Sequence, residues 1–142
     1  MKEFMLLIKK PRTDEDNVSE EFLKACEAYI DRLKADGNLI SAQPIESEDN
    51  MVLSKSKTWK LAPINESKVV IGGYYHLRVE DLEEAISIAK ENPEFAYHPT
   101  AKIEFRPIKT QEEDTGFVYP IDTASDVRSG YDEMELSMDD LS

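Results

Sequence analysis

Two histidines are the side chains of this sequence best suited to acid–base chemistry. His76 lies in an apolar and aromatic run, and His98 lies between Tyr97 and Pro99. An imidazole can take up or release a proton near neutral pH, and a neighbouring carboxylate can orient it as a general base. His76 is therefore the first catalytic candidate. The alternative is a histidine that makes only structural hydrogen bonds at a subunit interface.

A joint site is a second use of the two histidines. His98 could meet His76 in a pocket or help it to bind a metal ion. Metal sites in proteins need three or four ligands, and no spaced carboxylate or cysteine motif accompanies these histidines. Gly72 and Gly73 likewise lack the spaced-glycine pattern that binds phosphate groups. We therefore expect neither a metal site nor a cofactor.

A further set of polar and aromatic side chains could bind a small molecule. Glu104 and Arg106 are two residues apart in an extended run, so they point to the same side, and Arg106 could clamp a carboxylate. Tyr74, Trp59 and His98 could line a pocket for an aromatic group. We expect a small polar or aromatic ligand. Alternatively, Glu104 and Arg106 form an ion pair and the aromatic residues belong to the core or an interface.

One strand that runs directly into a helix is the stretch around which the other elements are arranged. Residues 69–78 alternate with period two, which predicts a strand with Tyr74 and His76 on the same face as Val70. Residues 80–92 then show an apolar helical stripe with acidic residues in the first turns. The two adjacent glycines of the strand predict a β-bulge or a close approach of another backbone.

The rest of the chain supplies partners for this strand and helix. The apolar run of residues 4–8 is typical of a central strand covered on both faces. The next helix is expected to have Asn17 as its N-cap and to end at Gly37, which tolerates a left-handed backbone. The remaining elements are a strand at residues 38–42, a hairpin from residues 51–53 and 58–61, a loop at 94–100 and a strand at 101–108.

This order predicts an α+β, ferredoxin-like protomer. Apart from the hairpin, the elements follow β-α-β-β-α-β, so both helices cover one face of a four-stranded antiparallel sheet. The other face would present Tyr74, His76, Glu104 and Arg106, a mixture too apolar for water and too polar for a dry core. We therefore expect a homodimer in which two such faces meet about a two-fold axis and form a dimeric α/β barrel.

Charge and composition argue against several kinds of partner. The net charge is −13 at pH 7, and such a surface repels phosphate backbones and anionic membranes. We expect no nucleic-acid and no membrane partner. The apolar run of residues 4–8 is too short for a signal peptide or a membrane span, so a cytoplasmic location is expected. Cys26, the only cysteine, lies on the apolar stripe of the first helix and is expected to be inert.

Residues 109–142 differ in character from residues 1–108. They contain ten acidic and two basic residues, and glycine and proline interrupt them. This pattern predicts an acidic tail that follows one α+β domain. Residues 117–121 are its one apolar island and could dock in a groove or pair with an edge strand. The tail could also bind a partner, so an interaction module is one of the functional hypotheses.

The sequence resembles the YCII-related domain family over residues 2–108, and in particular its DGPF branch. The resemblance rests on four stretches: KEFMLLIKK, AYIDRLKADGNLISAQPI, GGYYHLRVEDLEEAISIAKENP and IEFRPI. Members of this branch form dimeric α/β barrels from ferredoxin-like protomers. The resemblance therefore implies the same architecture for this chain.

Two departures from the family pattern bear on function. The stretch that corresponds to the Asp-Gly-Pro-Phe run is residues 61–64, in which only Pro63 is retained. Members thought to be catalytic carry a histidine on the first helix that works with an aspartate, and this first helix has none. The resemblance thus implies a dimeric barrel that is non-catalytic or binds a small polar molecule. The alternative is a cofactor-independent lyase or oxygenase-like enzyme with His76 as general base.

Overall fold

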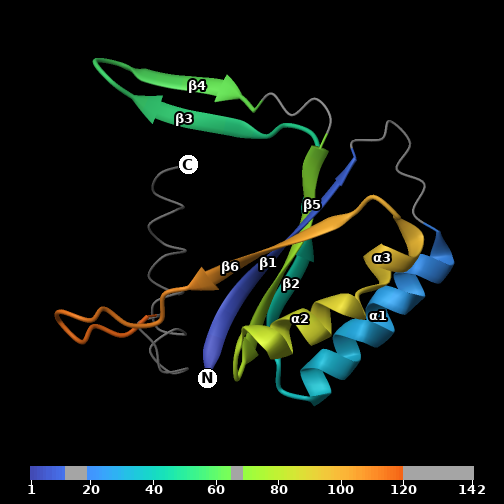
Figure 1. The fold of residues 1–142 in the computed structure, drawn as a ribbon. Helices are drawn as coiled ribbons and strands as arrows, with labels where there is room; N and C mark the ends of the chain where they lie inside the picture. The colour runs from blue at the N-terminus through green and yellow to red at the C-terminus, as the bar shows by residue number, and fades with distance from the viewer. Residues whose placement is uncertain (12–18, 65–68, 120–142) are drawn as a thin grey trace, which may run out of the picture. The chain divides into compact units, whose positions relative to one another are not determined.

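The structure is a computed structural model that describes residues 1–11, 19–64 and 69–119. The chain divides into two units, Met1–Ile108 and Lys109–Ser142. The first unit contains nine elements in the described residues, and Figure 1 labels them. They are β1 (Lys2–Pro11), α1 (Glu20–Ala35), β2 (Leu39–Pro44), β3 (Met51–Lys55), β4 (Trp59–Pro63), β5 (Val69–Val79), α2 (Leu82–Lys90), α3 (Pro93–Tyr97) and β6 (Lys102–Ile108).

The main sheet confirms the ferredoxin-like prediction. Its strand order is β2-β5-β1-β6, and each neighbouring pair is antiparallel. The core lies between one face of this sheet and the helices, where side chains of α1 and α2 pack against the strands. Leu6, Leu33, Leu77 and Val79 are its most deeply buried large side chains. Burial of these apolar groups is the main force that holds the helices on the sheet.

The central strand β1 is covered on one face only by the described residues. Phe4, Leu6 and Ile8 are buried against the helices, whereas Met5 and Leu7 are only half-buried on the other face. Within the described part of one protomer only one face of residues 4–8 is covered, so cover on both faces stays a prediction that depends on a partner. We call the uncovered side of β1, β5 and β6 the open face.

The adjacent glycines of β5 form the predicted β-bulge. Ile8 pairs with Gly73 and Lys9 pairs with Ile71, so Gly72 is the extra residue of β5. A bulge reverses the alternation of side chains before it. Val70 is consequently buried on the helix side, rather than on the face of Tyr74 as the uninterrupted alternation predicted.

The helix ends follow capping rules, with two corrections. The Oγ of Ser19 accepts a hydrogen bond from the backbone N–H of Phe22, so Ser19 is the N-cap of α1. The predicted cap, Asn17, lies outside the described residues. Residues after Pro93 form the short helix α3 instead of a loop, because proline is well suited to the first turn of a helix although it ends the preceding one.

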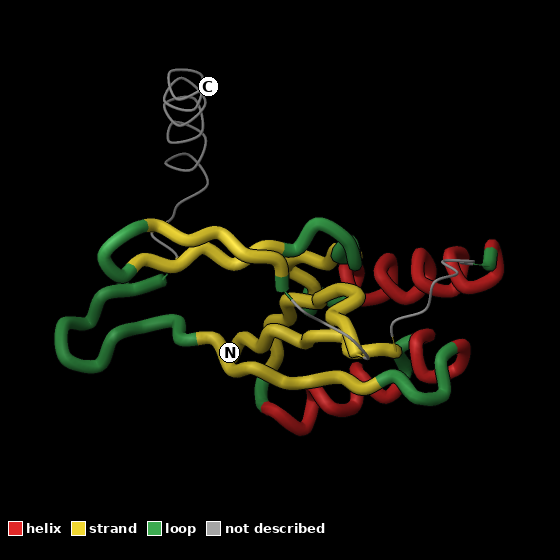
Figure 2. Tube along the Cα trace, turned by 90° about the horizontal axis from the view of Figure 1, so that it is seen from above, coloured by secondary structure: helices red, strands yellow, loops and turns green. Residues whose placement is uncertain are grey.

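The predicted hairpin is present as a separate two-stranded sheet of β3 and β4. Its strands are longer than predicted and pair from Met51 with Pro63 to Lys55 with Trp59. No helix lies over the hairpin in either view of the described residues (Figures 1 and 2).

The second unit is described only for residues 109–119. A bridge pairs Gln111 with Val118, and the N–H of Glu112 donates to the carbonyl of Phe117 at 2.7 Å. Gly116 adopts a φ of 73°, which closes this turn and favours glycine. The remainder of the predicted tail, including part of the apolar island at residues 117–121, lies outside the described residues.

Candidate functional site

His76 lies on the open face and has a carboxylate partner. Its Nε2 is 2.7 Å from Oε1 of Glu3, which lies on β1. The other oxygen of Glu3 is 3.7 Å from the guanidinium of Arg78, and the Glu3 side chain is only 11% exposed. A half-buried histidine held by a carboxylate has the arrangement of a general base and the group that orients it.

Glu104, which was expected on the same sheet face as His76, is not its partner. β1 lies between β5 and β6, and Met5 of β1 pairs with His76 on one side and with Arg106 on the other. Two strand spacings amount to about 10 Å, too far for a hydrogen bond. Glu104 instead binds Lys9 at 3.2 Å and Arg106 at 3.1 Å. These hydrogen bonds hold the pKa of Glu104 below its ordinary value.

The two aromatic candidates lie in different places. The hydroxyl of Tyr74 is on the open face, 2.8 Å from the Oγ of Ser41 on β2. Trp59 belongs to the β3–β4 hairpin, where the ammonium group of Lys55 lies 5.0 Å from its ring. Because these residues belong to separate sheets, the structure does not bring them together as one aromatic pocket.

His98 lies on the helix side of the sheet, so it does not meet His76. Its Nδ1 is 2.6 Å from Oε2 of Glu94 in α3, and its ring packs edge-on against Phe22 of α1. Glu94 is buried, with 7% of its surface exposed. The structure therefore does not bring the two histidines together, and the possible joint site is not formed. Within the described residues, no group of three or more His, Cys, Asp or Glu side chains could hold a metal ion.

Cys26 has the environment of an unreactive thiol. Burial, and then the nearby charge of Glu94, raise its pKa, while Lys10 acts weakly in the other direction. The thiolate is the nucleophilic form of cysteine, so a raised pKa makes this residue less reactive at neutral pH.

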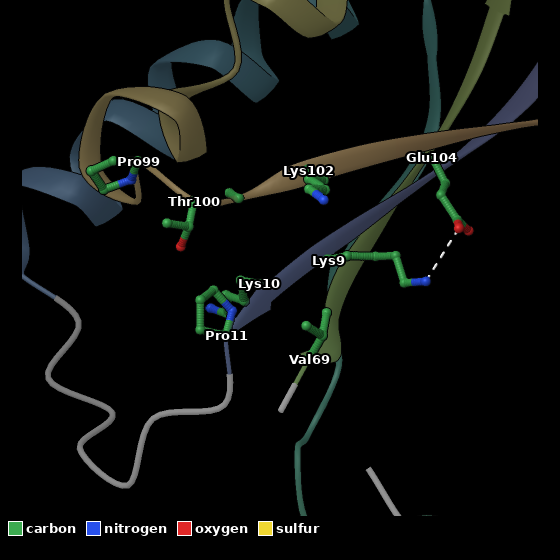
Figure 3. A pocket seen from close by; sticks show the side chains of 9 residues that line it. Lys9, Lys10, Pro11, Val69, Pro99, Thr100, Lys102 and Glu104 are labelled. Carbon is green, nitrogen blue, oxygen red and sulfur yellow. Dashed lines mark hydrogen bonds and ion pairs between the residues drawn. The ribbon is translucent and has the colours of Figure 1, made fainter. Parts of the chain in front are cut away.

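A cavity of about 760 Å³ lies beside the ends of β1, β5 and β6 (Figure 3). Three lysines, Lys9, Lys10 and Lys102, and one acidic residue, Glu104, are among the residues that line it. The other lining residues supply mostly apolar surface: Pro11, Val69, Pro99, Thr100 and Ala101. The volume lies within the range of pockets for small molecules. Pro11 and Val69 adjoin segments outside the described residues.

The profile of one protein family matches most of the chain. The YCII-related domain matches residues 2–109, which include all nine elements of the first unit. The chain belongs to the YCII-related domain family. This confirms the family resemblance inferred from the four sequence stretches.

Comparisons with individual proteins add less about this YCII-related domain. No curated protein matches the chain. One similar solved structure is the NMR structure of a de novo designed protein with a ferredoxin fold, which is 16% identical. The alignment covers 85% of this chain and 94% of that chain, with a TM-score of 0.33.

Four charged residues of the site in this YCII-related domain were not predicted. Glu3 is the partner of His76, and Lys9, Lys10 and Lys102 line the cavity. The alternation of β1 does place Glu3 on the face of Met5, so its face could have been found from the sequence. Its contact with His76 depends on which strands are neighbours.

No helix among residues 1–11, 19–64 and 69–119 of this YCII-related domain is long and apolar enough to cross a membrane.

Proposed function

We propose that this YCII-related domain works as a homodimer that binds a small anionic molecule with an apolar body. The observation that carries the proposal is the cavity lined by Lys9, Lys10 and Lys102. The same cavity has apolar walls, which favour a ligand that also buries hydrocarbon or aromatic surface. A carboxylate is the anion that we favour, since ammonium groups bind carboxylates through charge-assisted hydrogen bonds.

The charge of the cavity contrasts with that of the whole chain. The chain has a net charge of −13, yet three of the four charged side chains that line the cavity are basic. Lys9 is paired with Glu104. Among the described residues, no carboxylate lies within 4 Å of the ammonium groups of Lys10 and Lys102. We propose these two lysines as the residues that bind the anionic group of the ligand.

The dimer is proposed from the open face. Met5 and Leu7 form an apolar strip between charged and aromatic side chains of β5 and β6. Such a strip on the central strand favours contact with another protein surface. A second copy related by a two-fold axis would bring the same surface and would cover both open faces at once. Lys9 and Glu104 belong to this face as well as to the cavity.

Two finer assignments accompany this proposal. We place the chain in the DGPF branch of the family, because it retains Gly72, Gly73 and the two tyrosines that follow, although the Asp-Gly-Pro-Phe run is reduced to Pro63. We also propose a cytoplasmic location.

Titration with small carboxylates tests the ligand proposal. We expect aliphatic and aromatic monocarboxylates to shift backbone NMR signals of β1 and β6 around the cavity. Lys10→Met and Lys102→Met should each weaken binding about tenfold or more, since a hydrogen bond to a charged group contributes roughly 1.5–3 kcal/mol. Lys34→Met on α1 is the matched control and should bind as the wild type does. Equal affinities for all four proteins would refute the proposed site.

A second candidate function follows from the His76–Glu3 pair. With the carboxylate at 2.7 Å, His76 could remove an acidic proton from a carbon of a bound carboxylate, as a cofactor-independent lyase would require. The test is exchange of such protons with solvent deuterium, followed by NMR on a panel of small keto and hydroxy acids. His76→Asn should abolish exchange, whereas His98→Asn, on the helix side, should not. Absence of exchange with the wild type would exclude this candidate for the panel.

A further inference from the structure

One face of the β3–β4 hairpin is almost entirely apolar. The register pairs Leu53 with Leu61 and Lys55 with Trp59, so these residues share a face with Met51. All of them are exposed, and Trp59 is 66% exposed. The ammonium group of Lys55 lies over the Trp59 ring, so the stem of this lysine extends the apolar surface. We call this surface the hairpin face.

The hairpin face has no partner within the described part of the first unit. A two-stranded hairpin by itself is marginally stable in water. No described helix or other strand of this unit is packed on the hairpin face, since its large apolar residues are all exposed. Exposed apolar surfaces of this kind mark sites of contact with other molecules. A partner that is always present at the same concentration as the chain would stabilise the hairpin better than a partner that binds only transiently.

The charges along the hairpin are segregated. Lys55 and Lys57 lie at its tip, and residues 51–63 contain no acidic side chain. Glu46, Glu48 and Asp49 precede β3 at the base of the hairpin, and all three are exposed. The hairpin therefore has a basic tip and an acidic base, with the apolar face between them.

We propose that the hairpin face binds the same face of a second copy of this chain. In a two-fold arrangement, the basic tip of each hairpin lies against the acidic base of the other, and the apolar faces meet between them. An acidic peptide or an anionic membrane would be attracted by the basic tip but repelled by the acidic base. Only a partner with the opposite charge order matches both ends, and a second hairpin that runs the other way has this order.

This contact goes beyond the sheet-face dimer proposed above and is argued from the hairpin alone. Trp59 is the only tryptophan of the chain, so its fluorescence reports on the hairpin face. In concentrated wild-type protein we expect Trp59 emission at shorter wavelength and several-fold weaker quenching by acrylamide than after dilution. Sedimentation of the same samples gives the mass at each concentration.

Charge exchange tests the partner and the tip-to-base order. Lys55→Glu with Lys57→Glu makes both ends of the hairpin acidic, and Glu46→Lys with Glu48→Lys makes both ends basic. Each double variant alone should lose Trp59 protection and associate about tenfold more weakly or worse, because like charges then face each other at both ends.

A one-to-one mixture of the two double variants should restore Trp59 protection, since opposite charges face each other again at both ends. Lys24→Glu with Lys34→Glu on α1 makes the same change in net charge as the tip variant and should leave the wild-type behaviour intact. Circular dichroism of each variant shows whether it is folded.

Three results would overturn the inference. Trp59 could remain equally exposed at every concentration, the mixture could fail to restore its protection, or Trp59 could be protected even in samples that sediment as monomer. The last result would mean that the chain covers its own hairpin. A dimer in which Trp59 stays exposed would refute the hairpin contact and leave the sheet-face dimer intact. If Trp59 is protected in a dimer that forms equally well with Leu7→Glu, the hairpin contact is supported and the sheet-face dimer is refuted.

Discussion

Two tyrosine hydroxyls lie within the hydrophobic core of the first unit. The Tyr29 hydroxyl donates a hydrogen bond to the carbonyl of Ile88 at 2.6 Å, and its ring packs edge-on against Tyr75 at 5.7 Å. Burial raises the pKa of both phenols, that of Tyr75 to about 12. The nearby Cys26 and Glu94 add to the shift at Tyr75, because they also disfavour a phenolate.

These raised pKa values predict a loss of stability at alkaline pH. A phenol ionises near pH 10 in the unfolded chain, so the contribution of Tyr75 is complete below about pH 10 and is lost as pH rises toward 12. Urea unfolding at pH 8, 10 and 11 measures this loss. Tyr75→Phe should lose less stability across the range than the wild type, and Tyr74→Phe, on the open face, should behave as the wild type. Identical pH dependence in all three proteins would contradict the assignment.

At the scale of one element, β5 lies close to the backbone of β2 at Gly73, next to the bulge. A Cβ on Gly73 would lie 3.1 Å from the carbonyl oxygen of Gln43 and 3.4 Å from the Cα of Pro44, both backbone atoms. A Cβ on Gly72 would meet only the side chain of Lys10, which can move. A side chain therefore fits more easily at Gly72 than at Gly73, although the two glycines are adjacent in the sequence.

Gly73→Ala should destabilise the protein by about 1–3 kcal/mol more than Gly72→Ala, because the backbone of β2 must shift to make room. Both substitutions reduce the entropy of the unfolded chain to the same extent, so their difference isolates the contact. Urea unfolding of the two variants measures this difference. A Gly72→Ala variant at least as destabilised as Gly73→Ala would show that the approach of β2 does not limit this position.

The strands and their open face were predictable because period-two alternation is local. It placed Tyr74 and His76 together with Glu104 and Arg106 on one side of the sheet, as the structure has them. The bulge at Gly72 was predicted, yet its effect on Val70 was not, since the position of an extra residue depends on the partner strand.

The contacts of the site were less predictable than its face. His76 contacts Glu3 across two neighbouring strands, and Lys10 and Lys102 reach one cavity from opposite ends of the domain sequence. Such contacts follow from the strand order β2-β5-β1-β6. A ferredoxin-like fold predicts this order, but the spacing of residues along the sequence does not. The separation of His76 from Glu104 has the same cause, because β1 lies between their strands.

At the scale of the molecule, the first unit has one face buried by helices and one that the described residues leave open. Met5 and Leu7 lie at the centre of the open face, and ion pairs of Glu3 and Glu104 flank them on either side. A second copy explains both the apolar centre and the charged flanks. In the proposed dimer, the cavity beside Lys9 would lie at the edge of the interface and would stay open to solvent.

Sedimentation velocity of the full chain at micromolar concentration tests the dimer most directly. We expect a wild-type species of twice the 16.2 kDa chain mass. We expect Leu7→Glu to dimerise at least about tenfold more weakly, because a carboxylate replaces an apolar group at the centre of the open face. Leu23→Glu, on the exposed side of α1, is the matched control and should remain a dimer. A wild-type chain that sediments at 16.2 kDa, or a folded Leu7→Glu variant that dimerises as the wild type does, would contradict the account.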